Sequence, residues 1–272
     1  MRLLVPTDFS KCANNAMTFA LELASRTNAE VHVVHVIYPT EGSDNNVYNA
    51  LWIDEYYQRR EHDLKRWINR FRRNQPFKSI KISSSCETGF PVSTIKKVAA
   101  AQQSTLIVMG TTGATGLRGA IVGSTAAGIA GSVEIPVLAI PSRAQFKDQT
   151  SYVLATDLEL TINKVSLQML REILRAQHAN IHILHVTAGP EKHLDRQWED
   201  RINRELNGIT RQLHYLHDTD VSRAVHQFIN QMHANGLIVI SHHHSFLYKL
   251  IFQRVSRQLI QHAQVPILVL HD

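Results

Sequence analysis

The sequence predicts an α/β protein with two tandem, doubly wound domains, each built on a five-stranded parallel sheet. Three observations lead to this prediction. Short apolar segments alternate with amphipathic segments along the whole chain, which is typical of a parallel sheet covered by helices on both faces. The first half of the sequence is repeated in the second. The 272 residues, 44% of them hydrophobic, also suffice for two domains of ordinary size.

The expected elements of the first half follow from apolar periodicity and from helix-start signals. Ser10 is placed to cap a helix that carries Ala16, Phe19, Ala20 and Leu23 on one face, and Pro91 lies where the first turn of a helix accepts proline. Strands are expected over 3–5, 31–37, 80–83, 106–109 and 136–140, and further helices over 47–73, 91–103 and 124–132.

A glycine-rich loop follows the fourth expected strand. The strand Leu106–Met109 is apolar, and the loop after it carries glycines at positions 110, 113, 116, 119 and 123. Glycines let backbone amides approach a ligand closely, and the free N–H groups and dipole of the helix that begins at Ser124 favour an anion. The segment therefore predicts a phosphate-binding loop, with a turn that only packs as the alternative.

The loop does not match the common nucleotide-binding motifs. No lysine follows Gly123, so GxxxxGK[ST] is absent, and GxGxxG does not occur in the chain. The spacing that does occur is G-x2-G-x9-G-[ST], formed by Gly110, Gly113, Gly123 and Ser124. Arg118 inside the loop is open to two interpretations, a charge-assisted phosphate contact or an exposed side chain.

An internal repeat covers the chain. Three pairs of segments match, namely Leu4–Phe9 with Val153–Leu158, Val31–Val36 with Ile181–Val186, and Ile135–Ile140 with Val265–Leu270. The offset between the copies falls from 150 residues at the second strand to 130 at the last, so the second copy is shorter between these strands. Two domains are therefore expected, over 1–142 and 150–272.

The repeated motifs resemble one protein family. The segment Pro6–Ser10, the His-Val pair in the second strand, the glycine spacing and the closing segment Pro136–Ile140 together resemble the ATP-binding branch of the universal stress protein family. The resemblance implies tandem Rossmann-like domains of the adenine nucleotide alpha hydrolase-like type, packed as an internal pseudo-dimer. The closing strands 137–140 and 267–270 are expected to pair across that interface, because an unpaired apolar edge promotes aggregation.

In an open parallel sheet, ligands bind where the strand order reverses, which we expect between the first and fourth strands. By resemblance to the family, Pro6, Thr7 and Asp8 would line the adenosine of ATP, with the Asp8 carboxylate on a ribose hydroxyl or a water bound to Mg²⁺. Val36 would meet the adenine edge through its backbone. The residues implied for the ribose and phosphates are Met109, Gly110, Thr111, Gly113, Gly123, Ser124 and Thr125. For Asp8, a carboxylate that caps the following helix is the alternative.

The second copy departs from this pattern. Alignment on the closing strand replaces Gly123 by Gln253 and Ser124 by Arg254, and residues 241–254 contain no glycine. Side chains would stand where the backbone has to approach a phosphate, so one ATP per chain is expected, in the first domain.

A metal or another non-nucleotide ligand in the second domain is a further alternative. The chain has 16 histidines, and His242, His243 and His244 form the densest group. Adjacent residues on a strand point to opposite faces, so at most two of the three could converge, with His214 and His217 as possible company.

Bulk properties narrow the class of protein. The net charge is +6, but basic and acidic residues are mixed, so nucleic-acid binding is not favoured. The two cysteines form no CxxC motif, which indicates a reduced compartment, and no apolar run is long enough for a signal peptide or a membrane span. A cytoplasmic protein is expected.

The functional expectation is an ATP-binding stress-response protein that changes the behaviour of a protein partner according to nucleotide occupancy. No loop lysine and no base placed to orient a water accompany the glycine loop, so at most slow hydrolysis is expected. A slow ATPase or nucleotide transferase is the competing class. A homodimer of the tandem chain is also compatible with the resemblance.

Overall fold

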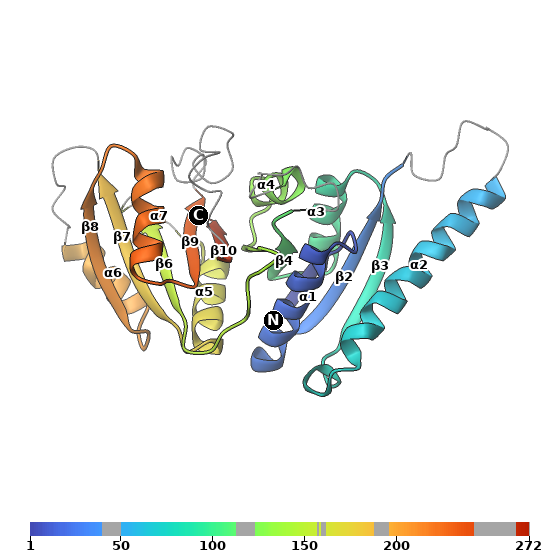
Figure 1. The fold of residues 1–272 in the computed structure, drawn as a ribbon, viewed down its shortest axis with the longest axis horizontal. Coiled ribbons are helices and arrows are strands. Elements are labelled where there is room, and N and C mark those ends of the chain that lie inside the picture. The colour runs from blue at the N-terminus through green and yellow to red at the C-terminus, as the bar shows by residue number, and fades with distance from the viewer. Residues whose placement is uncertain are drawn as a thin grey trace.

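The computed structural model describes residues 1–39, 50–112, 123–156, 158, 162–187, 196–241 and 265–271. Within these residues the chain forms one continuous ten-stranded sheet with helices on both faces (Figure 1). The predicted α/β class is confirmed.

Strands and helices alternate through the described part of the first half. The strands are β1 (Arg2–Pro6), β2 (Glu30–Ile37), β3 (Ile82–Thr88), β4 (Leu106–Gly110) and β5 (Val137–Ile140). The α-helices are α1 (Lys11–Thr27), α2 (Ala50–Arg72), α3 (Pro91–Ala101) and α4 (Ser124–Ala130), and a short 3₁₀ turn, η1, spans Gln75–Phe77. The main departure from the expected bounds is β3.

Strand β3 begins later and continues farther than the expected strand over 80–83. It pairs with β2 from Ile82 to Thr88, whereas the amide of Ile80 still donates to the Phe77 carbonyl oxygen in a turn, at 3.2 Å. A strand at the end of a sheet has a neighbour on one side only and tolerates polar residues. The polar run Ser83–Thr88 therefore gave no apolar signal.

The second half repeats this arrangement with shorter connections. Its strands are β6 (Ser151–Thr156), β7 (Asn180–Thr187), β8 (Arg211–His217), β9 (Gly236–Ser241) and β10 (Ile267–His271). Its described helices are α5 (Lys164–Ala176), α6 (Arg196–Glu205) and α7 (Val221–Gln231).

The strand order is β3-β2-β1-β4-β5-β10-β9-β6-β7-β8. Neighbouring strands are parallel within each half, and the two halves meet where β5 and β10 pair antiparallel, with Leu138 opposite Leu268. The expected pairing of the closing strands is therefore confirmed, and it gives the chain the form of an internal pseudo-dimer. In Figure 1 this junction lies near the middle, with β8 at one end of the sheet and β3 at the other.

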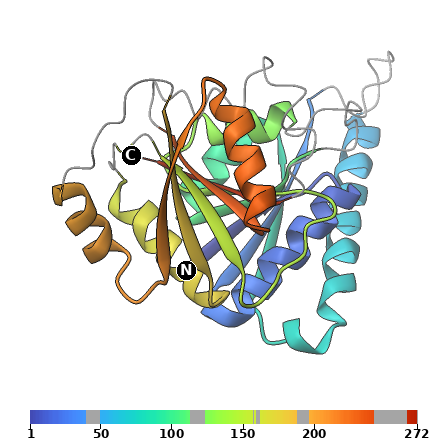
Figure 2. The same cartoon turned by 60° about the vertical axis from the view of Figure 1, so that its left-hand side comes forward.

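The core forms two layers, one on each face of the sheet. One layer joins the sheet to α1, α2, α5 and α6, and includes Leu21, Trp67, Leu170 and Leu206. The other joins it to α3, α4 and α7. Figure 2 shows the helices on the two sides of the twisted sheet. Alternate residues of each strand feed opposite layers, as in a sheet buried on both faces.

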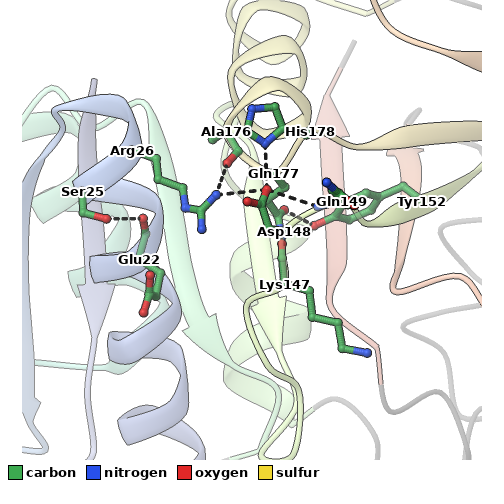
Figure 3. Close-up of polar contacts among 10 residues, drawn as sticks. All are labelled: Glu22, Ser25, Arg26, Lys147, Asp148, Gln149, Tyr152, Ala176, Gln177 and His178. Atoms are coloured by element: carbon green, nitrogen blue, oxygen red, sulfur yellow. Dashed lines mark hydrogen bonds and ion pairs between the residues drawn. The ribbon is translucent and has the colours of Figure 1, made fainter. Parts of the chain in front are cut away.

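A second contact between the halves lies at the ends of α1 and α5 (Figure 3). The Arg26 guanidinium lies 3.1 Å from Asp148 Oδ1 and donates to the Ala176 carbonyl oxygen at 3.1 Å. It also stacks on the Phe146 ring, with 5.0 Å between the guanidinium carbon and the ring centroid. His178 Nδ1 approaches the same Asp148 oxygen to 2.8 Å. Arg26 of the first half and His178 of the second half thus contact the same carboxylate, that of Asp148 in the connecting segment.

Candidate functional site

The strand order of the first half reverses between β1 and β4. Strand β1 pairs with β2 on one side and with β4 on the other, where Leu3 is opposite Leu106. Both pairs are parallel, so the carboxyl ends of β1 and β4 lie at the same edge of the sheet. This is the position at which open α/β sheets bind ligands, and it is where the sequence placed its candidate residues.

The segment after β1 is a tight turn held by its own polar side chains. Thr7 Oγ1 accepts a hydrogen bond from the amide of Phe9 at 3.0 Å, and Phe9 adopts a left-handed conformation with φ of 63°. Asp8 is exposed, and its Oδ1 accepts from the amide of Ser10 at 3.0 Å. Ser10 in turn caps α1 by accepting from the Ala13 amide at 3.1 Å, which confirms the predicted cap. The described contact of Asp8 therefore shapes the turn, while Ser10 caps the helix.

A buried histidine on β2 fixes this turn to the neighbouring strand. His35 Nδ1 lies 2.8 Å from the Thr7 carbonyl oxygen, and because a carbonyl can only accept, Nδ1 carries the proton. The Thr7 amide donates to the Val34 carbonyl oxygen at 2.9 Å. The Phe9 ring packs on the imidazole, with 4.4 Å between the centroids. The next residue, Val36, is half-buried on the opposite face of β2 and adjoins the layer of α3 and α4.

Gly110, at the end of β4, packs against the first turn of α1. A Cβ atom at this position would lie 2.9 Å from Cys12 Sγ and 3.0 Å from the Cys12 carbonyl carbon. No side chain fits there without displacing backbone, so packing alone requires glycine at 110. The contact also brings the start of α1 to the end of β4. The segment that follows β1 and the end of β4 therefore lie at the same edge of the sheet.

Thr111 and Gly123 are the residues at which the structure describes the two ends of the glycine-rich loop. Thr111 is buried and its amide donates to the Ile140 carbonyl oxygen at 3.1 Å. The Thr111 carbonyl oxygen accepts from the amide of Gly123 at 2.5 Å, so the two ends of the glycine-rich loop meet. Gly123 then occupies the N-cap position of α4. Its own amide is engaged within the protein.

The other predicted site residues lie at the end of β1, in the core, in the first turn of α4 or outside the described residues. Pro6 ends β1, and Met109 is buried in the layer of α3 and α4. Ser124 is exposed and Thr125 half-buried in the first turn of α4. Gly113 lies outside the described residues, as do the alternatives at Arg118, His242, His243, His244, Gln253 and Arg254.

Two residues that support the site were not among the predicted ones. Cys12 fills the space beside Gly110, and its Sγ donates to the Ile140 carbonyl oxygen at 3.2 Å. His35 holds the turn after β1. The repeat contained a signal for the histidine, because His185 stands at the matching position of the second half. No signal in the sequence pointed to Cys12.

The second half repeats the turn geometry. Thr156 Oγ1 accepts from the amide of Leu158 at 3.0 Å, Leu158 has φ of 71°, and His185 Nδ1 donates to the Thr156 carbonyl oxygen at 3.0 Å. Asp157 and the residues aligned with the glycine loop lie outside the described part of the chain. The turn after the first strand is therefore common to both halves, whereas the glycine spacing belongs to the first.

Cys12 and Cys86 are both free. Burial, followed by the nearby Glu61 and Glu87 carboxylates, raises the pKa of Cys86 to about 11, so its thiol is protonated at neutral pH. Among the described residues, no three His, Cys, Asp or Glu side chains group closely enough to hold a metal ion.

No helix in the described part of the chain has the length and apolar character needed to cross a bilayer.

Comparison with known proteins agrees with the fold and the repeat. A universal stress protein of Methanocaldococcus jannaschii is 29% identical over 146 residues, which are 51% of this chain and 81% of that protein. The crystal structure of a universal stress protein from Archaeoglobus fulgidus superposes with a TM-score of 0.68 at 23% identity, covering 98% of this chain and 95% of that one. A Pseudomonas aeruginosa protein assigned to the same family superposes with a TM-score of 0.63 at 13% identity, covering 99% and 92%.

The family model for the universal stress protein family matches the chain twice, over residues 1–141 and 153–271. The two matches correspond to the two halves of the sheet. Both halves have the sequence Thr-Asp after the first strand, and in both a histidine donates to the carbonyl oxygen of the threonine. The chain belongs to the universal stress protein family, as a tandem member with two copies of the family's unit.

Proposed function

We propose that this chain binds one ATP, together with Mg²⁺, in its first domain and acts as a regulatory protein of the stress response. The site would lie where β1 and β4 end, in the domain of residues 1–142. The domain of residues 150–272 would carry a degenerate copy of the site. The observation that carries the proposal is the packing of Gly110, at the end of β4, on Cys12 in the first turn of α1, which follows the Thr7–Asp8 turn at the reversal of strand order.

The polar groups at this edge suit a nucleotide. Asp8 presents an exposed carboxylate beside β1, which is the type of group that holds a ribose hydroxyl or a metal-bound water. The first turn of α4 has Ser124 and Thr125 hydroxyls and amides that precede the first intrahelical bond. These groups, together with the helix dipole, favour the phosphates. The residues proposed to form the ATP site are Pro6, Thr7, Asp8, Val36, Met109, Gly110, Thr111, Gly113, Gly123, Ser124 and Thr125.

The Gly110–Cys12 contact changes the role assigned to one glycine. Gly110 is required by packing, so it would position the loop rather than admit a phosphate. The Gly123 amide is bonded to the Thr111 carbonyl oxygen. Direct phosphate contacts would therefore come from the amides after Gly123 and from the loop that includes Gly113.

A regulatory role fits a site that binds without a catalytic set. The loop from 110 to 124 contains no lysine and no acidic residue, so it supplies neither the usual phosphate-binding lysine nor a base for water. We propose that nucleotide occupancy alters how the chain interacts with a protein partner.

Calorimetric titration of the full chain with ATP and Mg²⁺ tests the proposal. The expected result is one site per chain that is lost in Gly123→Val, because the branched side chain would stand at the cap of α4 beside the phosphates. Asp157→Asn in the second half is the matched control and should retain binding. A fitted value near two sites, or binding that survives Gly123→Val, would contradict the assignment.

A further inference from the structure

Two histidines on neighbouring strands of the second half face each other. His182 lies on β7 and His214 on β8, and His182 Nδ1 is 3.1 Å from His214 Nε2. In the strand register His182 is opposite Gln212, so His214 lies two residues farther along β8 and on the same face of the sheet. Both rings are half-buried. The pair therefore combines a defined geometry with access to solvent.

In the first half, the histidine at the position of His182 is His32, and its hydrogen-bond partners are serine hydroxyls. His32, the counterpart of His182, has Nδ1 at 2.8 Å from Ser83 Oγ and Nε2 at 3.2 Å from Ser85 Oγ. Strand β3 aligns with β8 so that Ile82 matches Arg211, which places Ser85 at the position of His214. The second half has exchanged a hydroxyl partner for a second imidazole.

The environment of both imidazoles favours their neutral form. Burial lowers the pKa of His182, as does the proximity of His214, and burial also lowers the pKa of His214. A neutral imidazole has one nitrogen with a free lone pair, and that form is the one that binds metals. The buried ring of Phe228 on α7 packs on His214 with 4.8 Å between centroids and on His182 with 6.2 Å. This packing restricts the orientation of both rings.

We propose that His182 Nδ1 and His214 Nε2 form a two-imidazole chelate for a divalent late transition metal such as Zn²⁺. Zn–N bonds of about 2.0–2.1 Å in a tetrahedral site place two nitrogens roughly 3.3–3.4 Å apart. The observed 3.1 Å therefore needs to widen by only a few tenths of an ångström. Without metal the two nitrogens form a hydrogen bond, so one of them carries the proton. Metal binding replaces this bond, and the ring that donated it takes its other tautomer, with the proton on its far nitrogen. His182 then carries Nε2–H and His214 carries Nδ1–H, and both lone pairs face the metal.

The remaining coordination positions fall to water or to another ligand. No third His, Cys, Asp or Glu joins the pair within the described residues. Strand β8 is the last strand of the sheet, so one side of the pair is not covered by another strand. The proposed chelate lies on β7 and β8, the outer strands of the second half. It does not depend on nucleotide binding in the first half.

The test is a Zn²⁺ titration of the full chain in a non-chelating buffer, read by calorimetry and by the ¹⁵N imidazole NMR signals of His182 and His214. His214→Ser puts at position 214 the counterpart of Ser85, one of the two serines that His32 contacts, so this variant should fold. Changes outside the coordination sphere already cost metal sites about 10–100-fold in affinity. Loss of a direct ligand should thus weaken the first binding event by roughly tenfold or more.

The reciprocal variant is Ser85→His, which places a second imidazole beside His32 in the first half. It should add one zinc-binding event that the unmodified chain lacks. The other histidines contribute the same background in every variant. Equal zinc affinity in His214→Ser and the unmodified chain, with no shift of the His182 signal in either, would overturn the proposal. A Ser85→His chain that gains no site would also count against the geometric argument.

Discussion

His35 on β2 donates from Nδ1 to the carbonyl oxygen of Thr7 across 2.8 Å, and this bond fixes the turn that follows β1. The second half contains the same bond between His185 and Thr156 at 3.0 Å. Both histidines are buried, and both threonines accept an amide two residues later in the chain. The turn is therefore a structural unit of the repeat, present with or without the glycine loop.

The first prediction separates the structural role of this histidine from its effect on the site. His35→Phe keeps an aromatic ring beside Phe9 but removes the donor to Thr7, which leaves a buried carbonyl without that bond. We expect the free energy of unfolding to fall by about 1–3 kcal/mol and ATP affinity to fall with it, measured by denaturant titration and calorimetry. His185→Phe should destabilise similarly but leave ATP affinity unchanged. Equal loss of affinity in both variants would show that the effect is not local to the first site.

Gly110→Ala tests the packing role of the glycine. The added methyl group would meet Cys12 Sγ at 2.9 Å and the Cys12 carbonyl carbon at 3.0 Å, so we expect the protein without ligand to lose about 1–3 kcal/mol of stability. Adding Cys12→Ala should restore only part of the loss, because the backbone contact remains. If Gly110 served ligand approach alone, Gly110→Ala would weaken ATP binding without changing the stability of the free chain.

Much of the fold followed from the sequence, because strand cores such as Leu106–Met109 are apolar runs and the repeat doubles the signal. The bounds expected for the edge strand β3 were wrong because most of its residues after Ile82 are polar and give no apolar pattern. At the site, the glycine spacing predicts a phosphate-binding loop between β4 and α4, which stays a prediction, whereas the packing that requires glycine at 110 could not be predicted. A close approach of Cys12, 98 residues away in sequence, leaves no local pattern.

The junction between the halves should be sensitive to charge at Leu268. Its side chain is fully buried, and it pairs with Leu138 across the antiparallel β5–β10 contact. Leu268→Ala should cost roughly 2–5 kcal/mol, and Leu268→Glu more, because an ionised carboxylate has no partner there. Val165→Glu, at an exposed position on α5, is the control and should change stability by less than about 0.5 kcal/mol. Chemical denaturation measures the stabilities. Independent domain motion in the unmodified chain, detected by small-angle scattering, would contradict the importance of this junction.

The stability of the protein should depend on pH through Asp148, the carboxylate that Arg26 and His178 of the two halves both contact. Hydrogen bonds from His178, and then from Arg26, hold the pKa of Asp148 below its ordinary value of 3.8. A depressed pKa means that the folded state favours the carboxylate. Its contribution is therefore present above about pH 4 and is lost as the pH falls through the folded value.

Asp148→Asn should consequently lower the melting temperature at pH 7 and make less difference as the pH approaches 3. Thermal unfolding across this range measures the effect, and added salt should reduce it because all three side chains are partly exposed. Asp200→Asn, at an exposed position on α6, is the control. A difference between Asp148→Asn and the unmodified chain that stays constant down to pH 3 would mean that the Asp148 charge is not what stabilises the junction.

The last prediction concerns Mg²⁺ and Asp8. The loop from 110 to 124 has one charged residue, Arg118, and no lysine, so the charge of the triphosphate should require a cation, and ATP should bind more tightly with Mg²⁺ than with a chelator. Asp8→Asn keeps an oxygen that can accept from the Ser10 amide, which preserves the turn while removing the charge. We expect this variant to lose roughly tenfold in affinity with Mg²⁺, about 1.4 kcal/mol, and little in its absence. Calorimetry under both conditions measures the difference. Equal affinity with and without Mg²⁺ in the unmodified chain would exclude the metal from the site, and an equal loss in Asp8→Asn under both conditions would assign the carboxylate to the ribose instead.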